Sequence, residues 1–196
     1  INADGAAHGH DPAVNPDATR WHVMAEGFRF QDLIDALIQQ ESVGDPMAVS
    51  NAGAIGLMQI MPQHASNLHG SSAPSVFDAA RERGFDVQEE TTSAARGLLF
   101  DPEINYALGD PYLRDLMRQY DGNIDLALTA YNAGPNAMDA VLESGGGIQD
   151  FADPEAQQYA QKVRGRYMAA NGRAMPDQID TRQLTRPQAR PAGLLE

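Results

Sequence analysis

Residues 30–41 read FQDLIDALIQQE, and the large apolar residues of this stretch recur three and four positions apart. This spacing places them on one face of an α-helix, as in a helix that packs against a core. The residues concerned are Phe30, Leu33, Ile34, Leu37 and Ile38. Gly44 and Pro46 follow, and both are residue types that commonly end a helix. The sequence therefore predicts a core helix that stops just beyond residue 41.

Glu41 stands at the end of this pattern. It follows Leu37 by four positions and Ile34 by seven, so its carboxyl continues the buried face. Burial and the negative end of the helix dipole would both raise its pKa. A carboxylic acid that stays protonated near neutral pH is suited to general acid catalysis. On position alone, a solvated Glu that turns outward is the simpler interpretation, and the flanking sequence has to decide.

Length and composition limit the class of protein. The 196 residues, 42% of them hydrophobic, suit one domain with tails and one sizeable core. A formal net charge of -13 disfavours nucleic acid and anionic lipid surfaces as partners, because both attract Lys and Arg. No apolar run reaches membrane-spanning length, and the absence of cysteine excludes disulfides and thiolate sites. The chain begins at Ile1, as expected of a processed product or of a segment of a longer protein.

The chain divides into an arm, a helical domain and a tail. Residues 1–27 lack an apolar period and read as an extended N-terminal arm, and residues 28–172 are mostly helical. Residues 173–196 have few apolar anchors and read as a C-terminal linker or tail. The sequence has no internal repeat and no convincing strand, so the predicted fold class is all-α.

Further helices are expected after residue 41. Asp-Pro-Glu, an N-terminal capping signature, occurs at 101–103 and again at 153–155. Pro111 should kink or divide the helix that the first signature opens. The expected helices are 62–68, about 75–83, about 91–99, 102–120, 124–131, 136–143 and 154–170.

Three sequence blocks follow one another along the chain, and a fourth motif comes after them. The blocks are Glu41-Ser42, GAIGLMQIMP at 53–62 and AYNAGP at 130–135, and the fourth motif is Glu155-x-x-x-Tyr159. In order and spacing they resemble the soluble-type lytic transglycosylase domain, which is similar to glycoside hydrolase family 23. The resemblance covers about residues 28–170. It implies a goose-lysozyme-like helical fold with a substrate groove, acting on bacterial peptidoglycan.

The resemblance also implies a reaction and a catalytic residue. Glu41 would act as the single acid/base, first protonating the glycosidic oxygen between N-acetylmuramic acid (MurNAc) and N-acetylglucosamine (GlcNAc). It would then take the proton of the C6 hydroxyl, which closes onto C1 and leaves a 1,6-anhydroMurNAc end. Such a reaction needs neither a cofactor nor a second carboxylate to activate water.

The resemblance further implies a set of substrate-binding residues. They are Ser42, Ser50, Gln59, Met61, Tyr131, Asn132, Glu155 and Tyr159. A buried phenol needs a hydrogen-bond partner, and for the hydroxyl of Tyr131 the resemblance suggests Glu41. Three alternatives stay open: Ser42 satisfies a free helix carbonyl, Ser50 is ordinary loop polarity, and Met61 packs in the core.

Glu155 has an alternative interpretation too, as a residue that only complements the N-terminal helix dipole. The family commonly has Thr after this Glu and Val after the Tyr, whereas this chain has Ala156 and Ala160. A second departure is the length of residues 69–100. This stretch could cap the groove or contact a partner, but an ordinary surface elaboration is the more common outcome.

The histidines give no metal site and no triad. The sequence His8-Gly9-His10-Asp11 has metal-like composition but lies in the arm without a third fixed ligand, so no metal is predicted. His64 and His69 are expected on a helix surface, and neither has the spacing of a Ser-His-Asp triad.

Two other functions stay open at this point. One is a hydrolytic muramidase on the same fold, and the other is a non-catalytic wall-binding or structural module of a phage virion or secretion apparatus. The expected partner in each case is the peptidoglycan glycan strand, so the protein would be periplasmic, exported or carried in a virion. The acidic charge favours delivery by a larger assembly, because like charges slow the approach to an anionic wall polymer.

Overall fold

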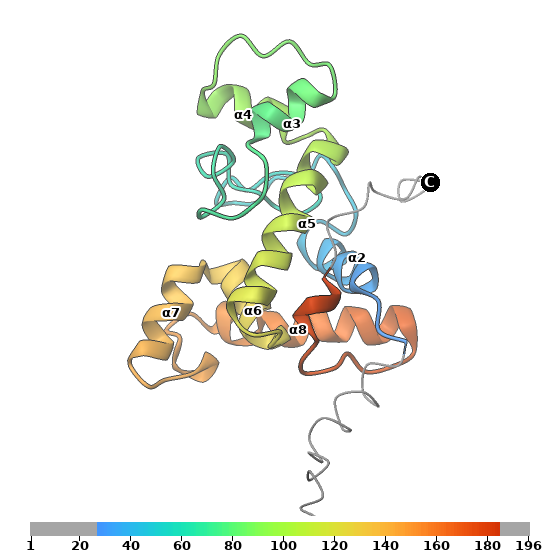
Figure 1. The fold of residues 1–196 in the computed structure, drawn as a ribbon, viewed down its shortest axis with the longest axis vertical. Coiled ribbons are helices and arrows are strands. Elements are labelled where there is room, and N and C mark those ends of the chain that lie inside the picture. Colours follow the sequence, from blue (N-terminus) through green and yellow to red (C-terminus); the bar gives the residue numbers. More distant parts are fainter. Residues whose placement is uncertain (1–26, 185–196) are drawn as a thin grey trace, which may run out of the picture.

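The computed structural model describes residues 27–184, and within them the protein is built from α-helices and short 3₁₀ turns (Figure 1). The helices are α2 (Phe30–Glu41), α3 (Val76–Glu82), α4 (Thr92–Leu98), α5 (Pro102–Gln119), α6 (Ile124–Ala133), α7 (Pro135–Glu143) and α8 (Pro154–Asn171). The 3₁₀ turns are η1 (Ile148–Asp150) and η2 (Thr181–Gln183). Across 27–184 there are isolated backbone bridges but no strand, which confirms the predicted all-α class. The His8–Asp11 segment lies outside the described residues.

Helix α2 forms where the apolar period predicted it. Leu33, Ile34 and Leu37 are fully buried, and the helix packs against α8. It ends at Glu41, where the backbone N–H of Ser42 still donates to the carbonyl of Ile38. The next residue, Val43, has φ +56, which turns the chain away from the helix axis.

Helix α5 lies between the α3–α4 pair and the other helices (Figure 1). Asp101 caps its start by accepting hydrogen bonds from the backbone N–H groups of Glu103 and Ile104, as the capping signature predicted. Pro111 lies inside the helix, yet α5 is a single element, so the predicted division does not occur. Buried residues before and after the proline hold both halves in the core, and this packing outweighs one missing hydrogen bond.

Residues 69–100 contain the α3–α4 pair, at one end of the molecule in Figure 1. Ser75 and Thr91 cap the two helices with their side chains, close to where the sequence predicted them to begin. Val76 and Phe77 are buried and join the main core, whereas residues 83–86 and 88–93 are exposed. The stretch is therefore anchored through its helices and presents its connecting loop to solvent.

The predicted helix over 62–68 is wrong, because residues 61–70 form turns instead. The chain makes successive turns there, with backbone hydrogen bonds from His64 to Met61 and from Asn67 to His64. A seven-residue helix gains few hydrogen bonds against its nucleation cost. In addition, the Asn67 side chain accepts a bond from the N–H of Gly70, a local pairing that competes with a helix.

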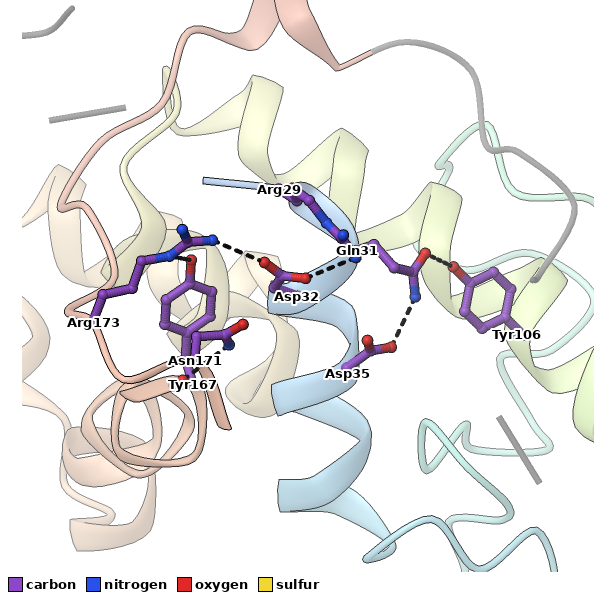
Figure 2. Close-up of polar contacts among 8 residues, drawn as sticks. All are labelled: Arg29, Gln31, Asp32, Asp35, Tyr106, Tyr167, Asn171 and Arg173. Carbon is purple, nitrogen blue, oxygen red and sulfur yellow. Dashed lines mark hydrogen bonds and ion pairs between the residues drawn. The ribbon is translucent and has the colours of Figure 1, made fainter. Parts of the chain in front are cut away.

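The N-terminal half of α2 is tied to two other helices by polar contacts (Figure 2). Asp32 pairs with Arg29 at 3.1 Å and with Arg173, beyond the end of α8, at 3.2 Å. On another side of α2, the hydroxyl of Tyr106 in α5 donates to Gln31 at 2.9 Å. These contacts fix the position of α2 between α5 and the end of α8.

Residues 173–184 pack onto the helices, although the sequence assigned them to a linker or tail. Met175 and Leu184 are buried. The backbone N–H of Ile179 donates to the carbonyl of Gly122, and Arg118 donates to the carbonyl of Leu184. The packed part of the chain therefore continues to Leu184. No helix in 27–184 has both the length and the apolar character needed to cross a bilayer.

Candidate active site

Glu41 lies at the C-terminal end of α2, beside α8. The packing of these two helices brings its carboxyl to Tyr159, whose hydroxyl donates a hydrogen bond to Oε1 of Glu41. Tyr159 itself is 2% exposed. The carboxyl thus faces α8, as the continuation of the apolar face predicted, and the outward-turned alternative is excluded.

The surroundings of Glu41 raise its pKa from the usual 4.5 to about 7. Burial is the largest cause, because it disfavours the charged form. The hydrogen bond from Tyr159 acts in the opposite direction, and repulsion from the carboxylate of Glu155 raises the pKa again. Near neutral pH the carboxyl is therefore present in both protonation states, as a residue that first donates and then accepts a proton requires.

Glu155 is exposed in the first turn of α8. Its negative charge raises the pKa of Glu41 and of Tyr159, which places it in the electrostatic neighbourhood of the acid. Its position also suits the helix dipole, so the two interpretations of this residue are compatible.

Ser42 is buried, and its hydroxyl contacts backbone groups. Its Oγ lies 2.9 Å from the carbonyl oxygen of Leu57 and 3.2 Å from that of Ile38, and it accepts a bond from the N–H of Gly44. The alternative that Ser42 satisfies a helix carbonyl is thus observed. The same contacts join the end of α2 to the loop over residues 53–60.

Ser50 and Gln59 stabilise this loop from within. Oγ of Ser50 accepts a bond from the N–H of Ala54, and Nε2 of Gln59 donates to the carbonyl of Gly56 at 2.9 Å and to that of Ala48 at 3.3 Å. Gln59 has φ +49, a conformation that is uncommon outside glycine and that is often found at functional sites. The loop is therefore held in one shape beside the end of α2.

Tyr131 does not bond Glu41, contrary to expectation. Its hydroxyl donates to the carbonyl of Met58 at 2.8 Å, and the phenol that reaches Glu41 is Tyr159. The charge of Glu41 nevertheless contributes, after burial, to raising the pKa of Tyr131, so the two groups are neighbours. Met61 is partly buried, which leaves part of its side chain accessible. Asn132, next to Tyr131, is exposed.

The sequence reasoning missed Asn105, which organises the same loop from α5. Its side chain is 0% exposed, accepts a bond from the N–H of Met58 and donates to the carbonyls of Ile55 and Leu99. A side chain at Gly56 would overlap this amide, and Gly56 also has φ +79. The available signal was a polar residue on the apolar face of α5.

Comparisons with known proteins identify relatives of this chain. Residues 29–151 match the model of the family described as Transglycosylase SLT domain. The chain is 32% identical over 148 residues to "Membrane-bound lytic murein transglycosylase C" of Yersinia pestis, a match that covers 72% of this chain and 36% of the relative. It thus spans well under half the length of the curated relatives that it matches.

Two solved structures share the fold. The lytic transglycosylase Slt of Pseudomonas aeruginosa, determined as an inactive mutant, has a TM-score of 0.51 and 26% identity, and covers 83% of this chain and 26% of its own. The 70 kDa soluble lytic transglycosylase of Escherichia coli has a TM-score of 0.54 and 24% identity, and covers 80% of this chain and 25% of its own. The predicted lysozyme-like fold of the lytic transglycosylase type is thereby confirmed.

Helix α8 lies beyond the matched residues 29–151, but it supplies the hydrogen bond to Glu41. The family match therefore includes Glu41 but ends before the helix that carries Tyr159. This match and the identity to the curated relatives lead to a plain assignment: this chain belongs to the transglycosylase SLT domain family.

Proposed function

We propose that this domain is a peptidoglycan lytic transglycosylase. It cleaves the β-1,4 bond between MurNAc and GlcNAc and leaves a 1,6-anhydroMurNAc end, with Glu41 as the single acid/base. The observation that carries the proposal is the partly buried Glu41 with a pKa of about 7, hydrogen-bonded by Tyr159, in a chain of the SLT family.

The reaction uses the two protonation states of Glu41 in turn. The protonated carboxyl gives its proton to the glycosidic oxygen while the bond from C1 to that oxygen breaks, and the GlcNAc unit leaves as an alcohol. The resulting carboxylate accepts the proton of the C6 hydroxyl, whose oxygen bonds to C1. The proton that Glu41 donated is thereby restored, and no water is consumed. The Tyr159 hydroxyl stabilises the carboxylate between the two steps.

The surrounding residues divide into two proposed roles. Ser42, Ser50 and Gln59 maintain the loop over 53–60 through their backbone hydrogen bonds, so that this loop can form one side of the substrate site. The substrate contacts are proposed for those of the expected site residues that have accessible atoms. They are Met61, Tyr131, Asn132 and Glu155, with Gln59 contributing its amide oxygen.

Products distinguish this reaction from hydrolysis. Purified sacculi are digested with the protein, and the released fragments are analysed by mass spectrometry, in which anhydro products lack one water relative to hydrolysed ones. Anhydro ends are expected from the unaltered protein and none from Glu41→Gln. Recovery of reducing-end muramic acid alone would refute the proposal, and binding without release of fragments would identify a wall-binding module.

Glu155 offers a sharper form of the same experiment. Hydrolysis would need a second carboxylate to activate water, and Glu155 is the carboxylate whose charge reaches Glu41. If Glu155 only binds substrate, Glu155→Gln keeps the anhydro product and raises KM. A change of product from reducing to anhydro ends in this variant would mean that the native enzyme is a hydrolase.

The substrate implies a location outside the cytoplasmic membrane. We propose that the domain acts as a periplasmic or exported protein, or is carried in a phage virion, and that an assembly delivers it to the wall. The support is the net charge of -13, which slows free approach to an anionic polymer. For the isolated protein the rate of lysis is then expected to rise with salt, because screening reduces the repulsion. A rate that falls with salt would contradict assembly-assisted delivery.

A further inference from the structure

Four aromatic rings lie in series between the neighbourhood of Glu41 and the surface. Tyr131 of α6 contacts Tyr112 of α5 with ring centroids 5.3 Å apart, and Tyr112 contacts His69 at 5.9 Å. His69 in turn contacts His64 at 5.0 Å. Three separate parts of the chain, the turns over 61–70 and the two helices, therefore build one row of rings.

The two ends of this row have different environments. At the inner end, Tyr131 is an electrostatic neighbour of Glu41 and bonds the carbonyl of Met58. Tyr112 is 5% exposed and fixes the middle of the row in the core. At the outer end, His64 and His69 are both exposed. The accessible rings of His69 and His64 thus stand two and three ring contacts away from the tyrosine that borders the acid.

His69 adopts this position at a conformational cost. Its φ is +50, in the left-handed region that residues with a side chain seldom occupy. Such a conformation is energetically unfavourable and tends to persist where a function depends on it. The Asn67 side chain, which accepts a bond from Gly70, helps to fix the turn.

We propose that His64 and His69 form an outer binding platform for one N-acetylhexosamine ring of the glycan strand, apart from the sugars at the cleaved bond. The apolar face of a pyranose packs on an aromatic ring, and imidazole nitrogens can donate to or accept from the acetamido and hydroxyl groups. The platform suits an uncharged sugar, because burial and the neighbouring His64 lower the pKa of His69 and favour its neutral ring. This inference rests on the proposed peptidoglycan substrate.

Substrate length provides the test. His64→Ala/His69→Ala is compared with the unaltered protein on long glycan strands and on tetrasaccharide fragments, with product release as the readout. For long strands KM is expected to rise about 3- to 10-fold with kcat unchanged, the loss expected for a stacking contact. For the tetrasaccharide the rise in KM should be smaller, because this fragment places fewer sugars beyond the cleaved bond.

Two further variants separate binding from folding. Gln63→Ala, at an exposed position of the same turns, should leave both constants unchanged. His64→Phe/His69→Phe retains the rings and should retain most of the affinity for long strands. The inference is overturned if the double Ala variant keeps its KM on long strands, or if its constants on the short substrate change equally.

Strand binding in a Glu41→Gln background tests the platform without catalysis. If adding His64→Ala/His69→Ala to the Glu41→Gln protein weakens its binding to intact strands, the platform is supported. This result is independent of the proposed function, which fails if the unaltered protein releases no anhydro product. Equal binding with and without the histidines, in a protein that does release anhydro products, refutes the platform alone.

Discussion

Replacing Glu41 by Gln should make the protein more stable at alkaline pH while abolishing its activity. The carboxyl is held in a site that disfavours its charge, so the folded state binds the Glu41 proton more tightly than the unfolded chain does. Between the two pKa values, rising pH therefore removes stability. Gln keeps the shape and can still accept the hydrogen bond from Tyr159, but it never becomes charged.

The magnitude follows from the shift. A rise from 4.5 to about 7 corresponds to about 3 kcal/mol, at about 1.4 kcal/mol for each pKa unit. This penalty is absent below about pH 4.5, grows as pH rises toward about 7, and is complete above that value. For a domain of this size it equals about 6–12 °C in Tm.

Urea denaturation of both proteins at about pH 8 and at about pH 4 measures the effect, together with lysis of sacculi. At the higher pH the Gln variant should have the larger free energy of unfolding, by up to about 3 kcal/mol, and at the lower pH the two should nearly agree. Equal differences at both pH values would refute the reasoning, because a gain or loss that is independent of pH cannot come from the titration of Glu41.

Three other substitutions test the contacts around the site. Tyr159→Phe removes the hydrogen bond that lowers the pKa of Glu41. The alkaline limb of the pH profile of kcat/KM should therefore move to higher pH, and kcat should fall; a move of this limb to lower pH would contradict the assignment. Asn105→Ala removes hydrogen bonds to three backbone groups and should cost about 3 kcal/mol in denaturation experiments, against less than about 0.5 for the exposed control Asn136→Ala. Similar losses in the two variants would exclude the organising role. Asp32→Ala removes the carboxylate that pairs with Arg29 and Arg173 in Figure 2, while Arg173 keeps its bond to Tyr167. The change should cost only about 1 kcal/mol, since Arg29 is 69% exposed, and a loss above about 3 kcal/mol would show a stronger network.

Local signals predicted most of the helices. The apolar period of α2 and the caps at Asp101, Asn123 and Asp153 depend on residues within a few positions, so they are legible in the sequence. The tertiary environment decided the exceptions. Packing in the core maintains α5 as one helix across Pro111. Residues 173–184 form hydrogen bonds with residues that are distant in the sequence.

The sequence predicted which residues belong to the candidate site, but not which of them form hydrogen bonds with one another. Glu41 and Tyr159 were both named as site residues, yet the family resemblance suggested Tyr131 as the hydrogen-bond partner of the acid. Only the packing of α8 on α2 determines which hydroxyl reaches Oε1. The role of Asn105 was hidden for the same reason, since its loop partners, Ile55 and Met58, lie about 50 positions away.

The contact between Glu41 and Tyr159 joins residues 118 positions apart, so the acid and its partner come from opposite ends of the domain. A ribosome that has made α2 through α7 has produced the acid and most of the core, but not the helix that completes its surroundings. Because contacts so distant in sequence form late and slowly, the nascent chain should stay inactive until α8 has emerged and docked. Such timing would delay the appearance of a wall-degrading activity until synthesis of the domain is nearly finished.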